Sequence, residues 1–245
     1  MSRRLLLVLA GLFAFVAGLV ATFPARVALD AFAPGAVRAW GVEGTLWRGK
    51  AAAVAVGRAG IGGVEWRLSP WSLLLLRPAA DLHVRRPDGF ASARVSVSLF
   101  GNALRVADLE AAAKLDSLPG TVVPNGTSGD VSARFAELVV RDGWPARAEG
   151  RAAVADLKLP GVKFPLGPLE FVFAGDAPVP VAEVRSLGGP LAVEGTLTLP
   201  GPGQWSLDAL LGPGENPPRE LVEGLAYVGE AADGGRRRVQ YSGGG

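Results

Sequence analysis

An uninterrupted apolar run of 19 residues, from position 5 to position 23, constrains what this chain can fold into more than any other feature. A helix rises about 1.5 Å per residue, so the run is close in length to the hydrocarbon core of a bilayer, about 30 Å thick. Arg3 and Arg4 precede the run, and Pro24 ends it. We therefore predict a transmembrane helix over residues 5–23.

The charges around the run predict its orientation. Arg3 and Arg4 lie before it, so the positive-inside rule assigns residues 1–4 to the cytoplasm and residues 24–245 to the far side of the membrane. A cleaved signal peptide is the alternative, but its apolar region is normally only about 7–15 residues long. The best cleavage-like triplet, residues 31–33, lies beyond the run and precedes a proline. Under either interpretation, the rest of the chain is exported across the membrane.

Composition predicts that residues 24–245 fold into a packed domain. Hydrophobic residues make up 49% of the chain and charged residues 20%, which excludes a disordered tail. Cysteine is absent, so neither disulfides nor thiol chemistry contribute. The formal net charge is +2, and the basic residues are mostly scattered singly, so we expect no nucleic-acid partner.

Hydrophobic periodicity is mostly two, which is typical of strands. Apolar and polar residues alternate over residues 81–85 and 94–99, with a Pro-Asp-Gly turn sequence between them, and the pattern recurs at 131–135. Glycine and proline punctuate the chain at strand-length intervals. The expected fold is all-β and antiparallel, a curved or sandwich-like sheet with one N-terminal transmembrane helix. One or two short helices are expected, at residues 69–76 and 218–223.

The pentapeptide Val-Glu-Gly-Thr-Leu occurs twice, at residues 42–46 and 193–197, with a weaker variant at 148–152. In each copy a glycine stands between β-favouring residues, which predicts a bulge or a close approach of another backbone. The simplest explanation of this repeated sequence is that one type of hairpin occurs more than once. Duplication of two half-domains is the alternative, which five residues do not establish.

Residues 44–50, GTLWRGK, match part of a phosphate-binding loop, but Ala51 stands where the magnesium-binding Ser or Thr is required. The bulky Leu46 and Trp47 occupy positions where backbone N–H groups would have to wrap a phosphate. We therefore interpret the segment as structural and expect no cofactor.

Catalytic residues are not indicated. His83 is the single histidine, and it lies within an alternating strand pattern with no cysteine to pair with. Carboxylates such as Asp108, Glu110, Glu149 and Asp208 are dispersed among arginines and indicate solvated faces. We predict a protein that is not an enzyme, with no catalytic, cofactor-binding or metal-binding residues, and no small-molecule substrate.

Four tryptophans, Trp40, Trp47, Trp66 and Trp71, crowd into the region after the apolar run, and Trp71 begins the apolar sequence WSLLLL. Packing of this segment in a core between helix and sheet is one interpretation. The other is that the segment contacts the bilayer surface or a partner's transmembrane helix, because tryptophan favours the membrane interface.

The order of these features resembles the type II secretion system protein N (GspN-type) family. The resemblance rests on the apolar N-terminus, the G-T-L-W-x-G block at residues 44–49 and the W-x-L-x-P-x-x-L block within 64–74. Three further Gly-rich blocks follow in the family's order, at residues 142–150, 187–195 and 229–244.

This resemblance implies a non-catalytic accessory component of the inner-membrane platform that exports folded proteins from Gram-negative bacteria. The expected protein is a single-pass inner-membrane protein with a periplasmic C-terminal domain that binds other platform subunits. The alternative from another class is a membrane-anchored periplasmic carrier of lipids or hydrophobic ligands. A closed core favours the scaffold and an open apolar groove favours the carrier.

Overall fold

The computed structural model describes residues 18, 22–32, 35, 37–57, 59–74, 77–98, 103–117 and 126–244. The transmembrane helix predicted over residues 5–23 lies almost entirely outside this set. Among the described residues, no helix combines the length and the apolar character needed to cross a membrane.

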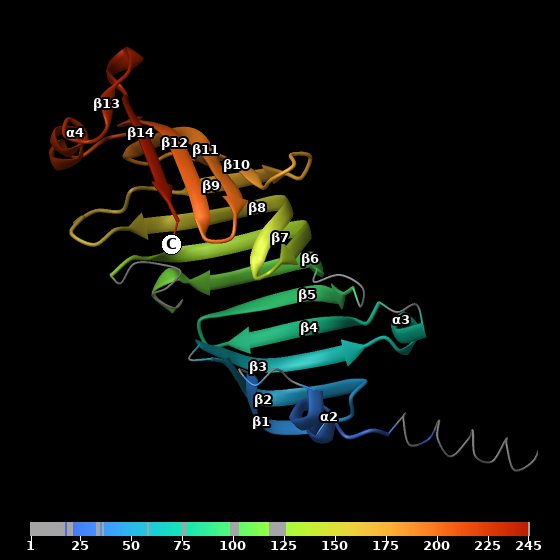
Figure 1. Cartoon of the computed structure of the whole chain (residues 1–245). Coiled ribbons are helices and arrows are strands. Elements are labelled where there is room, and N and C mark those ends of the chain that lie inside the picture. Colours follow the sequence, from blue (N-terminus) through green and yellow to red (C-terminus); the bar gives the residue numbers. More distant parts are fainter. Residues whose placement is uncertain are drawn as a thin grey trace, which may run out of the picture. The chain divides into compact units, whose positions relative to one another are not determined.

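The chain forms two compact units, unit 1 over residues 1–86 and unit 2 over residues 87–245. In unit 1, four strands pair in chain order, each antiparallel to the next. A helix precedes them, and a short helix connects the last two (Figure 1). The elements are α2 (Ala25–Phe32), β1 (Val37–Gly44), β2 (Arg48–Val56), β3 (Ala59–Leu68), α3 (Pro70–Leu74) and β4 (Ala79–Arg86).

Unit 2 contains the order β5-β6-β7-β8-β9-β10-β11-β12-β14-β13, and its paired neighbours run antiparallel. The all-β antiparallel fold predicted from the sequence is therefore confirmed. The strands are β5 (Gly89–Val97), β6 (Ala103–Lys114), β7 (Ser128–Arg141), β8 (Trp144–Lys158), β9 (Leu169–Ala174), β10 (Val181–Ser186), β11 (Leu191–Gly201), β12 (Gln204–Pro213), β13 (Glu230–Ala231) and β14 (Arg237–Gly243). The helical turns are η1 (Leu115–Ser117), α4 (Arg219–Leu225) and η2 (Asp233–Gly235).

The short helices follow proline signals in the sequence. Helix α3 begins at Pro70, and α4 begins directly after Pro218. Proline is favoured at the start of a helix because it has no backbone N–H and its φ is already close to the helical value. The Ser72 hydroxyl donates to the Ser69 carbonyl at 2.6 Å and accepts from the Ala79 N–H at 3.0 Å. These bonds end α3 and start β4. Helix α2 was not predicted from the sequence.

The apolar side of unit 2 closes on itself over its C-terminal strands. Strands β8 and β11 approach each other although two strands separate them in the sheet, and Figure 1 shows β10–β12 turned across β8. Helix α4 packs on β12 and contributes Leu221 and Leu225 to the interior. The resulting core comprises Leu166, Val184, Leu191, Val193, Ala209, Leu221, Leu225 and Val239. The main buried cluster of unit 2 thus lies beneath β10–β14.

The repeated pentapeptide forms two different structures. Gly44 has a φ of +90° where β1 ends in a turn, whereas Gly195 lies inside β11 and pairs with Ala209. Repetition of one hairpin type was therefore the wrong explanation. Close backbone approach was predicted correctly: a Cβ on either glycine would lie 2.5 Å from a carbonyl oxygen, that of Arg48 or Asp208.

Candidate functional site

The single histidine, His83, lies on a strand, as its alternating sequence pattern predicted, and its side chain is exposed. His83 lies on β4 opposite Glu65 of β3, and Glu65 forms an ion pair with Arg85 at 3.1 Å. Within the described ranges, no three His, Asp or Glu side chains gather as metal ligands would.

The GTLWRGK segment is the hairpin turn between β1 and β2. The Thr45 N–H donates to the Arg48 carbonyl at 2.8 Å, and the Leu46 N–H donates to the Phe23 carbonyl at 2.9 Å. Lys50 forms an ion pair with Glu43 at 3.0 Å. These groups are already engaged within the protein, so the turn does not present the free N–H groups and lysine of a phosphate loop.

The same turn ties three parts of unit 1 together. The Trp66 indole N–H donates to the Leu46 carbonyl at 3.1 Å, and the Leu68 N–H donates to the Trp47 carbonyl at 2.8 Å. Pro24 forms an isolated antiparallel bridge with Thr45. We call this group the junction: Phe23, Pro24, residues 45–47, Trp66 and Leu68. It joins the end of the apolar run to the ends of β1 and β3.

Ion pairs line the polar side of unit 2. Glu170 of β9 is only 8% exposed, and Arg185 of β10 donates to its Oε2 through Nε at 2.8 Å and Nη2 at 2.6 Å. The two residues face each other in the strand register, which places the guanidinium directly over the carboxylate. This pair stabilises a carboxylate that is otherwise nearly shielded from water.

A second cluster lies on β12 and β14. Arg238 donates to both carboxylate oxygens of Asp208, at 2.9 and 2.5 Å, and Gln240 donates to Oδ2 at 3.0 Å. The hydrogen bond from Arg238, then that from Gln240, lowers the pKa of Asp208 from 3.8 to about 2. Arg236 pairs with Glu194 at 3.2 Å on the same side.

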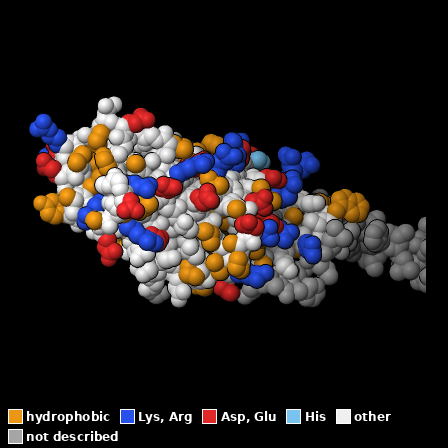
Figure 2. Space-filling model, turned by 90° about the horizontal axis from the view of Figure 1, so that it is seen from above, with side chains coloured by type: hydrophobic (Ala, Val, Ile, Leu, Met, Phe, Trp, Pro, Cys, Tyr) orange, Lys and Arg blue, Asp and Glu red, His pale blue; other side chains and the backbone are white. Residues whose placement is uncertain are grey.

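These ion pairs border an open depression of about 1440 Å³ over β10, β11, β12 and β14. The paired carboxylates Glu170, Glu194 and Asp208 each have an arginine partner. On the face drawn in Figure 2, basic and acidic side chains are interspersed. Arginine–carboxylate pairs therefore border the depression.

Comparison with known proteins gives one matching family model, described as "Type II secretion system (T2SS), protein N", over residues 35–240. The chain belongs to this family. A curated relative, the type II secretion system protein N of Aeromonas hydrophila, is 26% identical over 251 residues, covering 99% of each chain. No solved structure matches this chain.

The blocks that resembled protein N occupy turns and strand ends. Residues 44–49 form the β1–β2 turn, and residues 64–74 form the end of β3 together with α3. Residues 142–150 contain the β7–β8 turn, and residues 229–244 form β13 and β14. The Glu170–Arg185 pair was not predicted from the sequence, because only the strand register reveals it. Asp208 was interpreted as a solvated carboxylate, whereas it has arginine and glutamine partners.

Proposed function

We propose that this chain is a non-catalytic accessory component of a type II secretion system, held in the inner membrane by residues 5–23. The family match over residues 35–240 carries the proposal, and the full-length similarity to the Aeromonas hydrophila protein N supports it. Residues 1–4 lie in the cytoplasm and residues 24–245 in the periplasm, following the basic residues before the apolar run. Its partners are other subunits of the inner-membrane platform.

Anchoring supplies the proposed mechanism. A domain confined to the membrane plane has a high effective concentration beside neighbouring subunits, so weak contacts suffice. The proposed contact is the outer edge of β14. Residues 240–243 of β14 pair with β12 on one side, and no strand in the described part of the chain pairs with them on the other. A partner strand added there would gain main-chain hydrogen bonds.

Detachment of the domain tests the anchor. Replacing residues 1–23 by a cleavable signal retains the periplasmic residues but removes the membrane's concentrating effect, which linked systems show is worth roughly 100-fold or more. Secretion in a strain lacking the native copy should therefore fall sharply. Full complementation by the detached domain would refute scaffolding by an anchored protein. A periplasm-dependent reporter fused after Gly245 should be active, while the full chain fractionates with membranes at uncleaved mass.

Cysteine crosslinking tests the β14 edge. Because the chain has no cysteine, Ser242→Cys introduces a single thiol at this edge. Arg151→Cys is the matched control, an exposed residue on the interior strand β8. A photo-crosslinker on residue 242 should capture a platform subunit in membranes of the native host. Identical products from both positions would exclude the β14 edge as the specific contact.

One observation favours a second candidate, the carrier of hydrophobic ligands. Unit 2 has a mainly apolar depression of about 640 Å³ at the ends of β6, β7 and β8, within the range of ligand pockets. Its lining combines apolar residues, among them Val131, Ala153 and Leu187, with the charged residues Asp88, Lys114 and Asp130. An acyl chain is the ligand class that this lining fits. The closed core under β10–β14 instead favours the scaffold.

Lipid content distinguishes the two candidates. If the chain is a carrier, purified protein retains lipid after detergent exchange, and Ala153→Trp, which fills the depression, reduces the retained amount. If the chain is only a scaffold, Ala153→Trp leaves both lipid content and secretion unchanged. Mass spectrometry of extracted lipid, with a secretion assay on the same variants, separates these outcomes.

A further inference from the structure

Among the tryptophans whose side chains the structure describes, Trp71 is the most exposed, and it lies close in sequence to Leu68 of the junction. Trp71, in α3, is 76% exposed, although tryptophan is usually a largely buried residue. It directly precedes Ser72 and four consecutive leucines in the sequence, residues 73–76. Packing of Trp71 in a core, one of the two interpretations of this segment, was therefore wrong.

Hydrogen bonds fix the position of this tryptophan relative to the end of the apolar run. The Phe23 carbonyl accepts from Leu46, and the neighbouring Trp47 carbonyl accepts from Leu68. Leu68 ends β3, and α3 follows after one residue, Ser69. Trp71 thus follows shortly after Leu68, which connects to Phe23 through the neighbouring turn residues Leu46 and Trp47.

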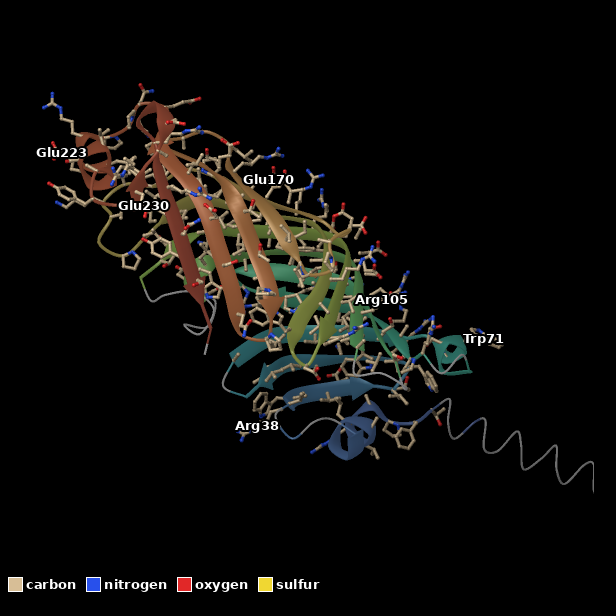
Figure 3. All side chains as sticks on the ribbon, turned by 45° about the horizontal axis from the view of Figure 1, so that its top comes forward. Arg38, Trp71, Arg105, Glu170, Glu223 and Glu230 are labelled. Carbon is tan, nitrogen blue, oxygen red and sulfur yellow. The ribbon has the colours of Figure 1, made fainter. Side chains whose placement is uncertain are left out.

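The end of unit 1 that carries Trp71 also carries exposed arginines. Arg48 starts β2, Arg67 lies opposite it in β3, and Arg77 follows α3, and all three are exposed. Asp81, in the strand position opposite Arg67, is the acidic residue nearest in register. Figure 3 shows Trp71 at this end of unit 1 and Arg38, at the start of β1, at the opposite end.

We propose that α3, with Trp71 as its anchor, lies in the periplasmic surface of the bilayer and holds unit 1 against the membrane. An indole favours the headgroup region, where its ring is in apolar surroundings and its N–H remains hydrated. The nearby exposed arginines favour anionic headgroups. The bilayer is the chosen occupant because the apolar run ends at Phe23, inside the junction. This inference rests on the proposed membrane anchor.

Site-specific labelling of the full-length protein tests the proposal. Trp71→Cys supplies a single thiol in the cysteine-free chain, for labelling with an environment-sensitive fluorophore. Trp40→Cys is the matched control: Trp40 is also exposed, at 53%, but lies in β1 four residues before Gly44, roughly 13 Å along the strand. Both proteins are reconstituted in nanodiscs of phosphatidylethanolamine and phosphatidylglycerol that contain a lipid with a quencher near its headgroup.

The label at residue 71 should lose intensity to the lipid quencher and shift its emission to shorter wavelength, while the label at residue 40 should respond to iodide in water. Equal lipid quenching at the two positions, or iodide quenching of both, would overturn the proposal. In native membranes, shielding of residue 71 from both quenchers would indicate a partner's transmembrane helix and overturn it too. Failure of the protein to enter nanodiscs would instead refute the anchor. Circular dichroism confirms that both variants are folded.

Discussion

The Trp66 ring lies against Gly49 so closely that a Cβ at Gly49 would overlap the indole. The same added Cβ would be 2.8 Å from the Glu43 carbonyl oxygen. Gly49 is opposite Trp66 in the β2–β3 register, and the Trp66 N–H donates to the Leu46 carbonyl. The last glycine of the G-T-L-W-x-G block is therefore explained by an aromatic ring packed on the strand.

Gly49→Ala should destabilise the protein. The new methyl group displaces the Trp66 ring or the β1 backbone, and overpacking of this kind costs about 1–3 kcal/mol. Gly60→Ala is the matched control, because a Cβ at Gly60 in β3 meets no atom within 4 Å. Gly60→Ala should leave stability equal or slightly higher, since alanine restricts the unfolded chain. Denaturant unfolding measures both, and equal stabilities of the two variants would contradict the packing described.

Arg185→Ala should weaken the protein more than the loss of an exposed ion pair. It leaves the nearly buried Glu170 carboxylate without its two hydrogen bonds, at a cost of about 1.5–3 kcal/mol. Arg236→Ala removes the exposed pair with Glu194 and should cost only about 0.2–1 kcal/mol. Thermal unfolding of both variants measures the two losses of stability. A larger loss from Arg236→Ala would show that burial of Glu170 does not set the ranking.

The Asp208 cluster should make stability depend on acid pH. Its carboxyl pKa is lowered from 3.8 to about 2, chiefly by the hydrogen bond from Arg238. A lowered pKa stabilises the folded state above about pH 3.8, and this contribution is lost as the pH falls to about 2. The melting temperature of Asp208→Asn should therefore be lower than that of the wild type at pH 7. This difference in melting temperature should shrink as the pH falls toward 2.

The control for this pH dependence is Asp176→Asn, a change at an exposed residue between β9 and β10. Its melting temperature should differ from that of the wild type by the same small amount at pH 7 and at pH 2. A wild-type advantage over Asp208→Asn that persisted undiminished at pH 2 would show that the ionised carboxylate is not its source.

His83→Ala and Lys50→Ala should both be close to silent in a secretion assay. His83 is an exposed strand residue, for which cross-strand contributions are roughly 0.2–1 kcal/mol. Lys50 contributes an ion pair whose two side chains are 61% and 68% exposed. Loss of secretion in a folded His83→Ala protein would indicate chemistry at that residue. The same result for Lys50→Ala would revive phosphate binding at the β1–β2 turn.

The strand content followed from local patterns. Alternation at residues 81–85 and 131–135 predicted β4 and β7, because a strand with one buried face repeats every two residues. Pro70 and Pro218 marked the starts of α3 and α4, because their backbone constraint acts within one turn. Helix α2 was missed because it follows Pro24, which was interpreted only as the end of the apolar run.

The sequence by itself determined the apolar run, the absence of thiol chemistry and the antiparallel β class, because each depends on composition or on residues near one another in the chain. Only the tertiary structure decided that Trp71 is exposed while Trp66 packs on Gly49, and that Glu170 meets Arg185. The tertiary structure also decided that the same pentapeptide forms a turn at Gly44 but a strand at Gly195. Burial and strand register depend on neighbours distant in sequence, and those neighbours override local preference.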